Sequence, residues 1–163
     1  NGPGGLAGVY AEENSREAIF DALRRREVFG TSGPRIEPRL FAGAELPADL
    51  CERSDRLELA DRAGVPMGAD LVLEAGAAGP VFAAFASADP GTADAPGHDL
   101  QRIQLIKGWV DDDGGLHEDV VDVAGGPNDA SVDPATCETR GRGARELCGV
   151  WRDPDYDPAL GAV

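Results

Sequence analysis

Residues 11–36 read AEENSREAIFDALRRREVFGTSGPRI and predict a capped helix followed by a sharp turn. Asn14 precedes the first turn and Glu17 follows three residues later, which is the spacing of a capping box. Apolar residues recur at helical spacing in AIFDAL, so a helix over residues 15–27 has one apolar face. Three arginines in its last turn suit the negative end of the helix dipole. The TSGP sequence at residues 31–34 then ends the helix.

The stretch before this helix predicts a β/α unit. Residues 6–10 are short and apolar, as expected of a buried parallel strand. In β/α barrels the ends of the strands line the active site, which makes Glu12 and Glu13 candidate catalytic residues. The alternative is purely structural: both carboxylates stabilise the positive end of the helix.

The rest of the chain has the pattern of β-structure. Pro38 lies in a partly alternating run, which restricts that strand to a sheet edge or a bulge. The Asp113-Gly114 pair is a hairpin turn signal. Short apolar runs between turns predict an antiparallel, sandwich-like region in which Trp109 and Trp151 are largely buried. The expected elements are strands at 35–41, 81–87 and 147–151, a hairpin over 100–123 and a short helix at 54–63 whose inner face carries Leu57 and Ala60.

Four stretches of this chain resemble the C-terminal part of a bacterial family of unknown function related to the polymerase and histidinol phosphatase (PHP) metallohydrolases. They are GLAGVYAEENSREAIFDALRRREVFGTSGPRI from Gly5, GVPMGADL from Gly64, LQRIQLIKGWVDDDGGLHEDVVDVA from Leu100 and LCGVWRDPDYDP from Leu147. The resemblance implies a C-terminal fragment that follows a metal-binding barrel of the same protein. It also implies a divalent metal in the parent protein and a periplasmic or secreted location.

Together these observations predict an α+β fold with two parts. Residues 1–33 would be the terminal β/α unit of a PHP-like barrel, and residues 34–163 a β-rich sandwich-like domain that stops before its last strand. At 163 residues the chain is too short for a complete barrel of ~250 residues.

Charge and hydropathy exclude several partners. The formal net charge of −15 argues against nucleic acid and against an anionic membrane surface, which it would repel. No apolar run approaches the ~20 residues that a membrane-spanning helix needs. The oligomeric state is not predicted by any pattern in the sequence.

Candidate sites for ions are few. No metal ligand is predicted, because the two histidines, His98 and His117, form no compact metal motif with the cysteines. The acidic turn at residues 111–114 suggests calcium, but it departs from the EF-hand spacing, and acidic hairpin tips are common on solvated surfaces, which is the favoured interpretation. Thr31, Ser32 and Arg35 could bind an anion. Alternatively, the two hydroxyls shape the turn and Arg35 pairs with an acid.

Three cysteines allow one disulfide with one thiol left over. We expect Cys137 and Cys148 to pair and Cys51 to stay free, because the pair would close a Gly- and Arg-rich loop with little apolar content. Such a closure contributes ~3 kcal/mol by restricting the unfolded chain. The exported location that the resemblance implies would preserve the bond. Two unpaired thiols remain the alternative.

Two functions follow from these patterns. In the first, the β-rich region supports or shapes the catalytic barrel of a metal-dependent, phosphoesterase-like hydrolase, and the fragment alone is inactive. In the second, it is a non-catalytic module that binds a glycan or a protein. Exposed Ile19, Phe20 and Leu23 would favour the first, whereas a concave patch around Trp109 or Trp151 would favour the second.

Overall fold

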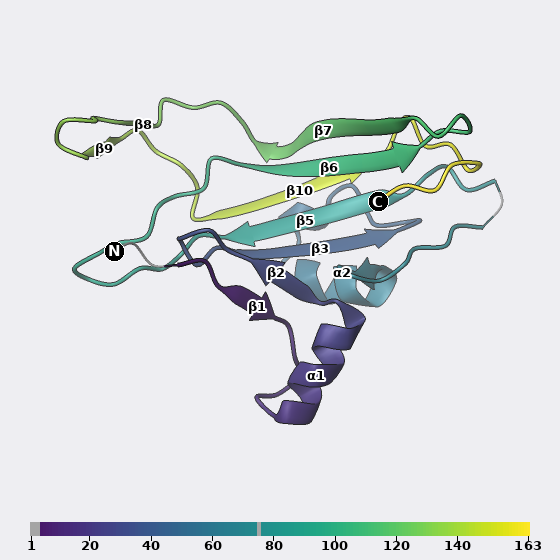
Figure 1. Ribbon diagram of the computed structural model, residues 1–163, viewed down its shortest axis with the longest axis horizontal. Coiled ribbons are helices and arrows are strands. Elements are labelled where there is room, and N and C mark those ends of the chain that lie inside the picture. Colours follow the sequence, from purple (N-terminus) through teal and green to yellow (C-terminus); the bar gives the residue numbers. More distant parts are fainter. Residues whose placement is uncertain (1–3, 75) are drawn as a thin grey trace.

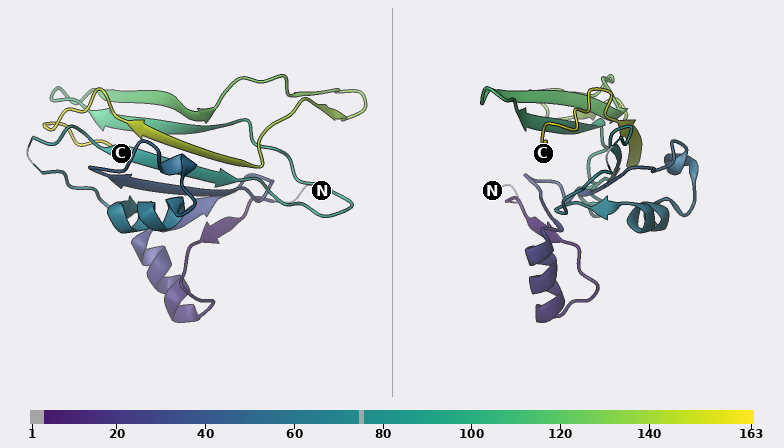
Figure 2. Two further views of the ribbon diagram at one scale, coloured as in Figure 1. Left: turned by 180° about the vertical axis from the view of Figure 1, so that it is seen from behind. Right: turned by 90° about the vertical axis from the view of Figure 1, so that its right-hand side faces the viewer.

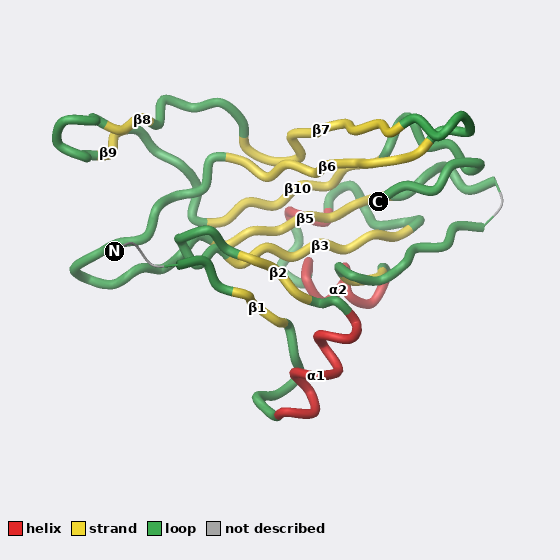
Figure 3. Tube along the Cα trace, in the orientation of Figure 1, coloured by secondary structure: helices red, strands yellow, loops and turns green. Residues whose placement is uncertain are grey.

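The computed structural model describes residues 4–74 and 76–163, and the fold there is mostly β (Figure 1). All strand pairs with a described register are antiparallel. The helices are short, and long loops connect the strands (Figure 3). The elements are β1 Ala7–Val9, α1 Arg16–Arg25, β2 Val28–Gly30, β3 Glu37–Gly43, the 3-10 helix η1 Leu50–Glu52, α2 Arg56–Ala63, β4 Val65–Pro66, β5 Val81–Ser87, β6 Arg102–Val110, β7 Leu116–Gly125, β8 Ser131–Val132, β9 Thr139–Arg140 and β10 Glu146–Arg152.

The main sheet has the order β10-β5-β3-β4, and β5 is its central strand. The β5 sequence, VFAAFAS, pairs along its whole length with β3 on one side and β10 on the other. This confirms the apolar strand predicted at residues 81–87. Helix α2 and η1 cover one face of the sheet (Figure 2). The buried core there consists of Phe41, Leu46, Leu50, Ala60, Val81, Ala83 and Phe85.

The predicted hairpin is confirmed as β6 and β7. Its register shifts between Ile103 and Gln104, close to where the alternation of the sequence changes phase. Gly149 of β10 packs directly against the Val123 backbone of β7, so the hairpin lies beside the main sheet. On the other side of β6, Gly108 and Val163 exchange two backbone hydrogen bonds.

Pro38 lies at an unpaired edge of its strand, as its missing amide hydrogen predicts. It faces Ala86 of β5 on one side. On the other side, β4 pairs only with Phe41 and Ala42, so Pro38 has no strand neighbour there within the described chain.

The predicted α+β fold with a terminal β/α barrel unit is wrong. Val9 of β1 lies opposite Val28 of β2, so the two strands form an antiparallel pair with α1 inserted between them. Arg26 takes a left-handed conformation and lets β2 start almost at once, opposite the end of β1. A parallel crossover would need the chain to return to the start of β1. The expected sandwich is likewise replaced by one four-stranded sheet and several two-stranded ones.

Two smaller predictions also need correction, and a third is confirmed. Ser15, and not Asn14, is the N-cap of α1, and its hydroxyl accepts a hydrogen bond from the Ala18 amide. In α2, Ala60 is buried as expected, but Leu57 is 44% exposed. The prediction that Trp109 and Trp151 are largely buried is confirmed, since only a minor part of each residue is exposed, and each ring stacks on a neighbouring ring.

Candidate functional site

Glu12 and Glu13 lie in the turn between β1 and α1, at the end of the projecting unit that is farthest from the main sheet (Figure 1). Both side chains are exposed. Within residues 4–74 and 76–163, no three His, Cys, Asp or Glu side chains gather closely enough to hold a metal ion. Both carboxylates precede the positive end of α1, where they stabilise the helix electrostatically.

Two of the three candidate anion-binding residues take part in the hydrogen bonding of the fold. The Thr31 hydroxyl accepts a hydrogen bond from the Leu6 amide at 3.1 Å and closes the β1–β2 pair. The Arg35 amide donates to Asp89 at 2.8 Å. This bond and one from Gly91 hold the pKa of the Asp89 carboxyl below its usual range. A carboxylate beside Arg35 disfavours an anion there, while Ser32 stays exposed in the turn.

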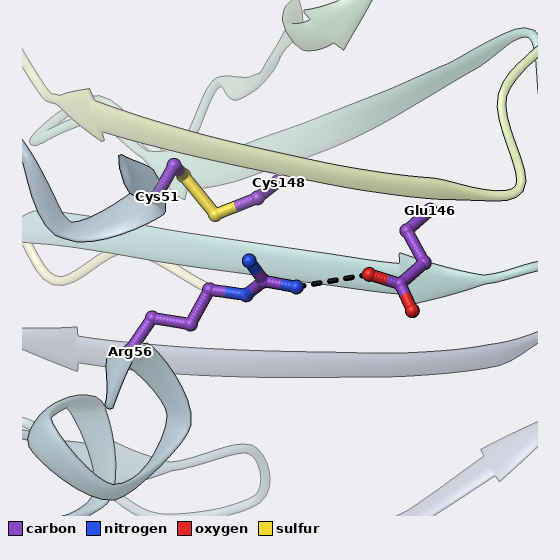
Figure 4. Close-up of a disulfide and its surroundings, with 4 residues drawn as sticks. All are labelled: Cys51, Arg56, Glu146 and Cys148. Carbon is purple, nitrogen blue, oxygen red and sulfur yellow. Dashed lines mark hydrogen bonds and ion pairs between the residues drawn. A yellow bond between two sulfur atoms is a disulfide. The ribbon is translucent and has the colours of Figure 1, made fainter. Parts of the chain in front are cut away.

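The disulfide joins Cys51 and Cys148, not Cys137 and Cys148 (Figure 4). Cys51 belongs to η1 and Cys148 to β10, and their Cα atoms are 5.6 Å apart. The two cysteines are 97 residues apart in the sequence. The pair expected from the sequence, Cys137 and Cys148, would have closed a much shorter loop. Burial of Leu50 places η1 against the sheet and brings Cys51 to β10. Cys137 is free and exposed.

A row of polar and aromatic side chains on the inner face of the β6–β7 hairpin was not predicted. Lys107 forms an ion pair with Asp153 at 2.6 Å, and Asp153 is only 6% exposed. The Lys107 ammonium lies 5.1 Å from the Trp109 ring centre, and Trp109 stacks on His117. His117 in turn contacts Asp111 at 2.7 Å.

This row holds loops together. Asp153 also accepts the Asp155 amide, and Lys107 donates to the Asp155 carbonyl, so the ion pair fixes the turn after β10. Asp111 accepts the amides of Asp113 and Gly115. These bonds, with His117 contributing most, hold the pKa of the Asp111 carboxyl below its usual range. The acidic tip is therefore organised by hydrogen bonds to its own backbone, which accounts for it without calcium.

A hollow of about 370 Å³ lies between residues 97–101 and the excursion that carries β8 and β9. Its polar groups largely satisfy one another. Gln101 donates to Asn128 at 3.0 Å, and Arg140 pairs with Asp133 at 3.6 Å. The hollow does not gather the candidate residues of the sequence.

One attachment of the β1, α1 and β2 unit to the sheet is a small polar contact. The Tyr10 hydroxyl donates to the Pro38 carbonyl at 3.0 Å, and the Arg39 guanidinium lies 3.9 Å from the Tyr10 ring centre. Burial raises the pKa of the Tyr10 hydroxyl, against the opposing charge of Arg39. Beyond this contact α1 buries only Ala22.

Large apolar side chains of this unit face solvent. Phe20 is 58% exposed and Leu23 is 54% exposed, on the same side of α1. Leu6 and Val28 from the two strand segments are exposed as well. The Arg24 guanidinium lies over the Phe20 ring, 5.9 Å from its centre, but all four side chains keep a large exposed fraction within the described chain.

Comparison with known proteins gives one match. Residues 1–163 match the family described as Protein of unknown function (DUF3604). The chain belongs to this family. No curated protein and no solved structure matches the DUF3604 chain significantly. None of the helices described for the DUF3604 chain is long and apolar enough to span a membrane.

The GVPMGADL stretch of the DUF3604 chain has a structural explanation. Val65 and Pro66 form β4 against the end of β3, and the Met67 amide donates to the Leu40 carbonyl. Gly68 has a φ of +87°, and a Cβ there would collide with the carbonyl oxygen atoms of Arg25 and Arg26. This loop therefore packs the end of α1 against the main sheet.

Proposed function

We propose that this DUF3604 domain is the β-rich, non-catalytic part of a PHP-like, metal-dependent hydrolase, in which it packs on the catalytic domain and shapes it. The metal ligands would lie in that catalytic domain. Glu12 and Glu13 would lie near the junction, because they sit at the tip of the projecting unit.

The exposed apolar surface of the projecting unit carries this proposal. Leaving an aliphatic side chain such as Leu23 in water forfeits ~1.5–3 kcal/mol of burial. Besides Phe20 and Leu23 on α1, the same unit exposes Leu6 and Val28 from its strand segments. An amphipathic helix with its apolar face uncovered is stabilised when a second domain covers it.

The tryptophans support this function over glycan binding. A glycan platform needs an aromatic ring with a free face. The Trp109 ring is stacked on His117, and the Trp151 ring is stacked on Phe82 with the centroids 5.6 Å apart. Both rings are used within the fold.

The disulfide supports the periplasmic or secreted location that we propose for the protein. Disulfides persist in oxidising compartments and are rare in the cytosol. The bond between Cys51 and Cys148 is consistent with export.

The test uses the double variant Phe20→Ser/Leu23→Ser in two settings. In the isolated chain we expect an unchanged melting temperature, because these side chains contact little within it. In the protein as naturally encoded, we expect lower thermal stability and lower hydrolase activity, because the interface with the catalytic domain is lost. Leu57→Ser, on the exposed side of α2, is the control.

An equal loss of melting temperature in both settings would contradict the proposal, since the side chains would then stabilise this domain alone. The proposal also requires histidine and aspartate metal motifs upstream in the natural coding sequence. If these motifs are absent, the proposal that the protein is a metal-dependent hydrolase is wrong.

A further inference from the structure

The outer face of the β6–β7 hairpin carries apolar side chains where an exposed sheet face is normally polar. Ile106 lies opposite Val120, and Val110 lies opposite Leu116. These side chains are 64%, 48%, 50% and 85% exposed, respectively. Strand alternation places all four on one face, with only Gly108 and Glu118 between the two pairs.

The opposite face of the same hairpin is already used by the fold. Leu105, Lys107 and Trp109 alternate with the exposed residues and are each only partly accessible to solvent. The outer face is therefore an additional apolar surface, and the hydrophobic core does not need it.

Acidic residues border this surface. Asp112 and Asp113 form the hairpin tip beside Val110 and Leu116, and Glu118 lies within the strip. No ion pair is found for these three acids in the part of the chain that the structure describes, whereas the neighbouring Asp111 and Asp122 do have partners. The outer face carries one cation, Arg102, at the end of β6 away from the hairpin tip, and the Arg102 guanidinium is paired with Asp122 at 3.2 Å. The other residues of this face include no lysine or arginine: Gln104, Ile106, Gly108, Val110, Leu116, Glu118, Val120 and Asp122.

We propose that the outer face of the β6–β7 hairpin docks an amphipathic, basic helix of a protein partner. The apolar side of that helix would cover the four aliphatic side chains, and its lysines and arginines would meet the acidic border. A helix laid on a sheet face is one of the stable layer arrangements of proteins. The strip from residue 106 to residue 110 is ~13 Å long, which a helix of ~9 residues spans at 1.5 Å per residue.

Charge selects this occupant over a second copy of the chain. Two outer faces in contact would bring like charges together at Asp112, Asp113 and Glu118, in molecules that each carry a net charge of −15. The surface also differs from that of the proposed function. The hairpin and α1 lie at opposite ends of the molecule in two views (Figures 1 and 2). Docking here therefore neither depends on nor tests the packing of α1.

The probe is an 18-residue peptide of leucine and lysine, with leucine on one helical face, titrated into the whole chain by isothermal calorimetry. A peptide of the same composition in scrambled order controls for non-specific attraction to an acidic protein. We expect micromolar binding of the amphipathic peptide, at least tenfold weaker binding of the scrambled one, and weaker binding in 500 mM salt than in 50 mM salt.

Two sets of variants locate the site. Ile106→Thr/Val120→Thr keeps two β-branched residues in the strands, and we expect it to bind the peptide at least tenfold more weakly. Glu118→Gln should weaken binding and reduce its salt dependence. Val72→Thr and Val132→Thr change two valines that are exposed elsewhere and should leave binding unchanged.

Three results would overturn the proposal: no binding, equal binding of the two peptides, or unchanged binding by Ile106→Thr/Val120→Thr when circular dichroism shows that the variant is folded. A dimer of the chain that Leu116→Ser dissociates, seen in sedimentation, would overturn it in favour of self-association.

Discussion

At the scale of single residues, Leu50 is the largest side chain with less than 2% exposure in the described chain. It lies in η1 and packs into the core formed by β3, β5 and α2. We expect Leu50→Ala to lower the free energy of unfolding by ~2–5 kcal/mol, because the cavity it leaves is only partly filled by relaxation. Leu57→Ala, which removes a half-exposed leucine nearby in sequence, should cost much less. Urea denaturation measures both, and equal losses would contradict the burial of Leu50.

The disulfide offers a second test at this scale. Removing both Cys51 and Cys148 by alanine substitution should lower the free energy of unfolding by ~2–5 kcal/mol, because the bond closes a long loop in the unfolded chain. Cys137→Ala should have no such effect, since this thiol is free. Denaturation curves with and without reductant provide the measurement. The pairing would be disproved if the Cys137 variant alone lost the sensitivity to reductant.

Asp89 gives a pH-dependent prediction. Its pKa is lowered in the folded state from an ordinary value of 3.8, chiefly by the hydrogen bond from the Arg35 amide. A depressed folded pKa contributes stability that is present above the unfolded pKa and is lost as the pH falls through the folded pKa. We therefore expect Asp89→Asn to destabilise the protein at pH 7 and to destabilise it less at pH 2.5, where more of the wild-type carboxyl is protonated.

The measurement for Asp89 is urea denaturation at both pH values. Asp94→Asn is the matched control, because this acid belongs to the same loop and accepts no hydrogen bond among the described residues. A loss of stability for Asp89→Asn that is the same at both pH values would show that the carboxylate charge is not the cause.

At the scale of elements, the start of α1 allows a test of which of two neighbouring residues, Asn14 or Ser15, is the N-cap. Because the Ser15 hydroxyl accepts the Ala18 amide, we expect Ser15→Ala to destabilise α1 by ~0.5–2 kcal/mol. Asn14→Ala should have little effect. Hydrogen exchange of the α1 amides is the appropriate measurement, since the helix projects from the sheet and can open without global unfolding. Faster amide exchange in Asn14→Ala than in Ser15→Ala would show that Asn14 is the N-cap, as the capping-box spacing predicts.

Local sequence predicts best those elements whose type and position do not depend on tertiary contacts. The VFAAFAS strand is bounded by Gly-Pro and Asp-Pro, and the β6–β7 hairpin has its Asp-Gly turn. Both appear where they were predicted. The α2 helix was located correctly, but the orientation of Leu57 was not, because an eight-residue helix shows too few apolar positions to define its buried face.

At the scale of the whole molecule, the 163-residue chain should lack phosphoesterase activity. Glu12 and Glu13 are exposed and have no histidine beside them to complete a multi-metal centre within the described residues. The assay adds manganese or zinc to the purified chain with generic phosphate mono- and diesters. Turnover well above a metal-only control, lost in Glu12→Gln/Glu13→Gln, would place a complete active site in this chain.

The sequence by itself determined the antiparallel β character of the chain from residue 35 onward, the position of α1 and the location of Pro38 beside an open edge. These features depend on side-chain periodicity, turn residues and proline geometry, which act within a few residues. The direction of β2 against β1 was decided by the tertiary structure, because the side-chain pattern of residues 28–30 does not specify which strand they pair with or in which direction. The same holds for the Cys51–Cys148 bond. Its two thiols meet only after Leu50 is buried and η1 packs on the sheet, and sequence separation carries no information about that contact.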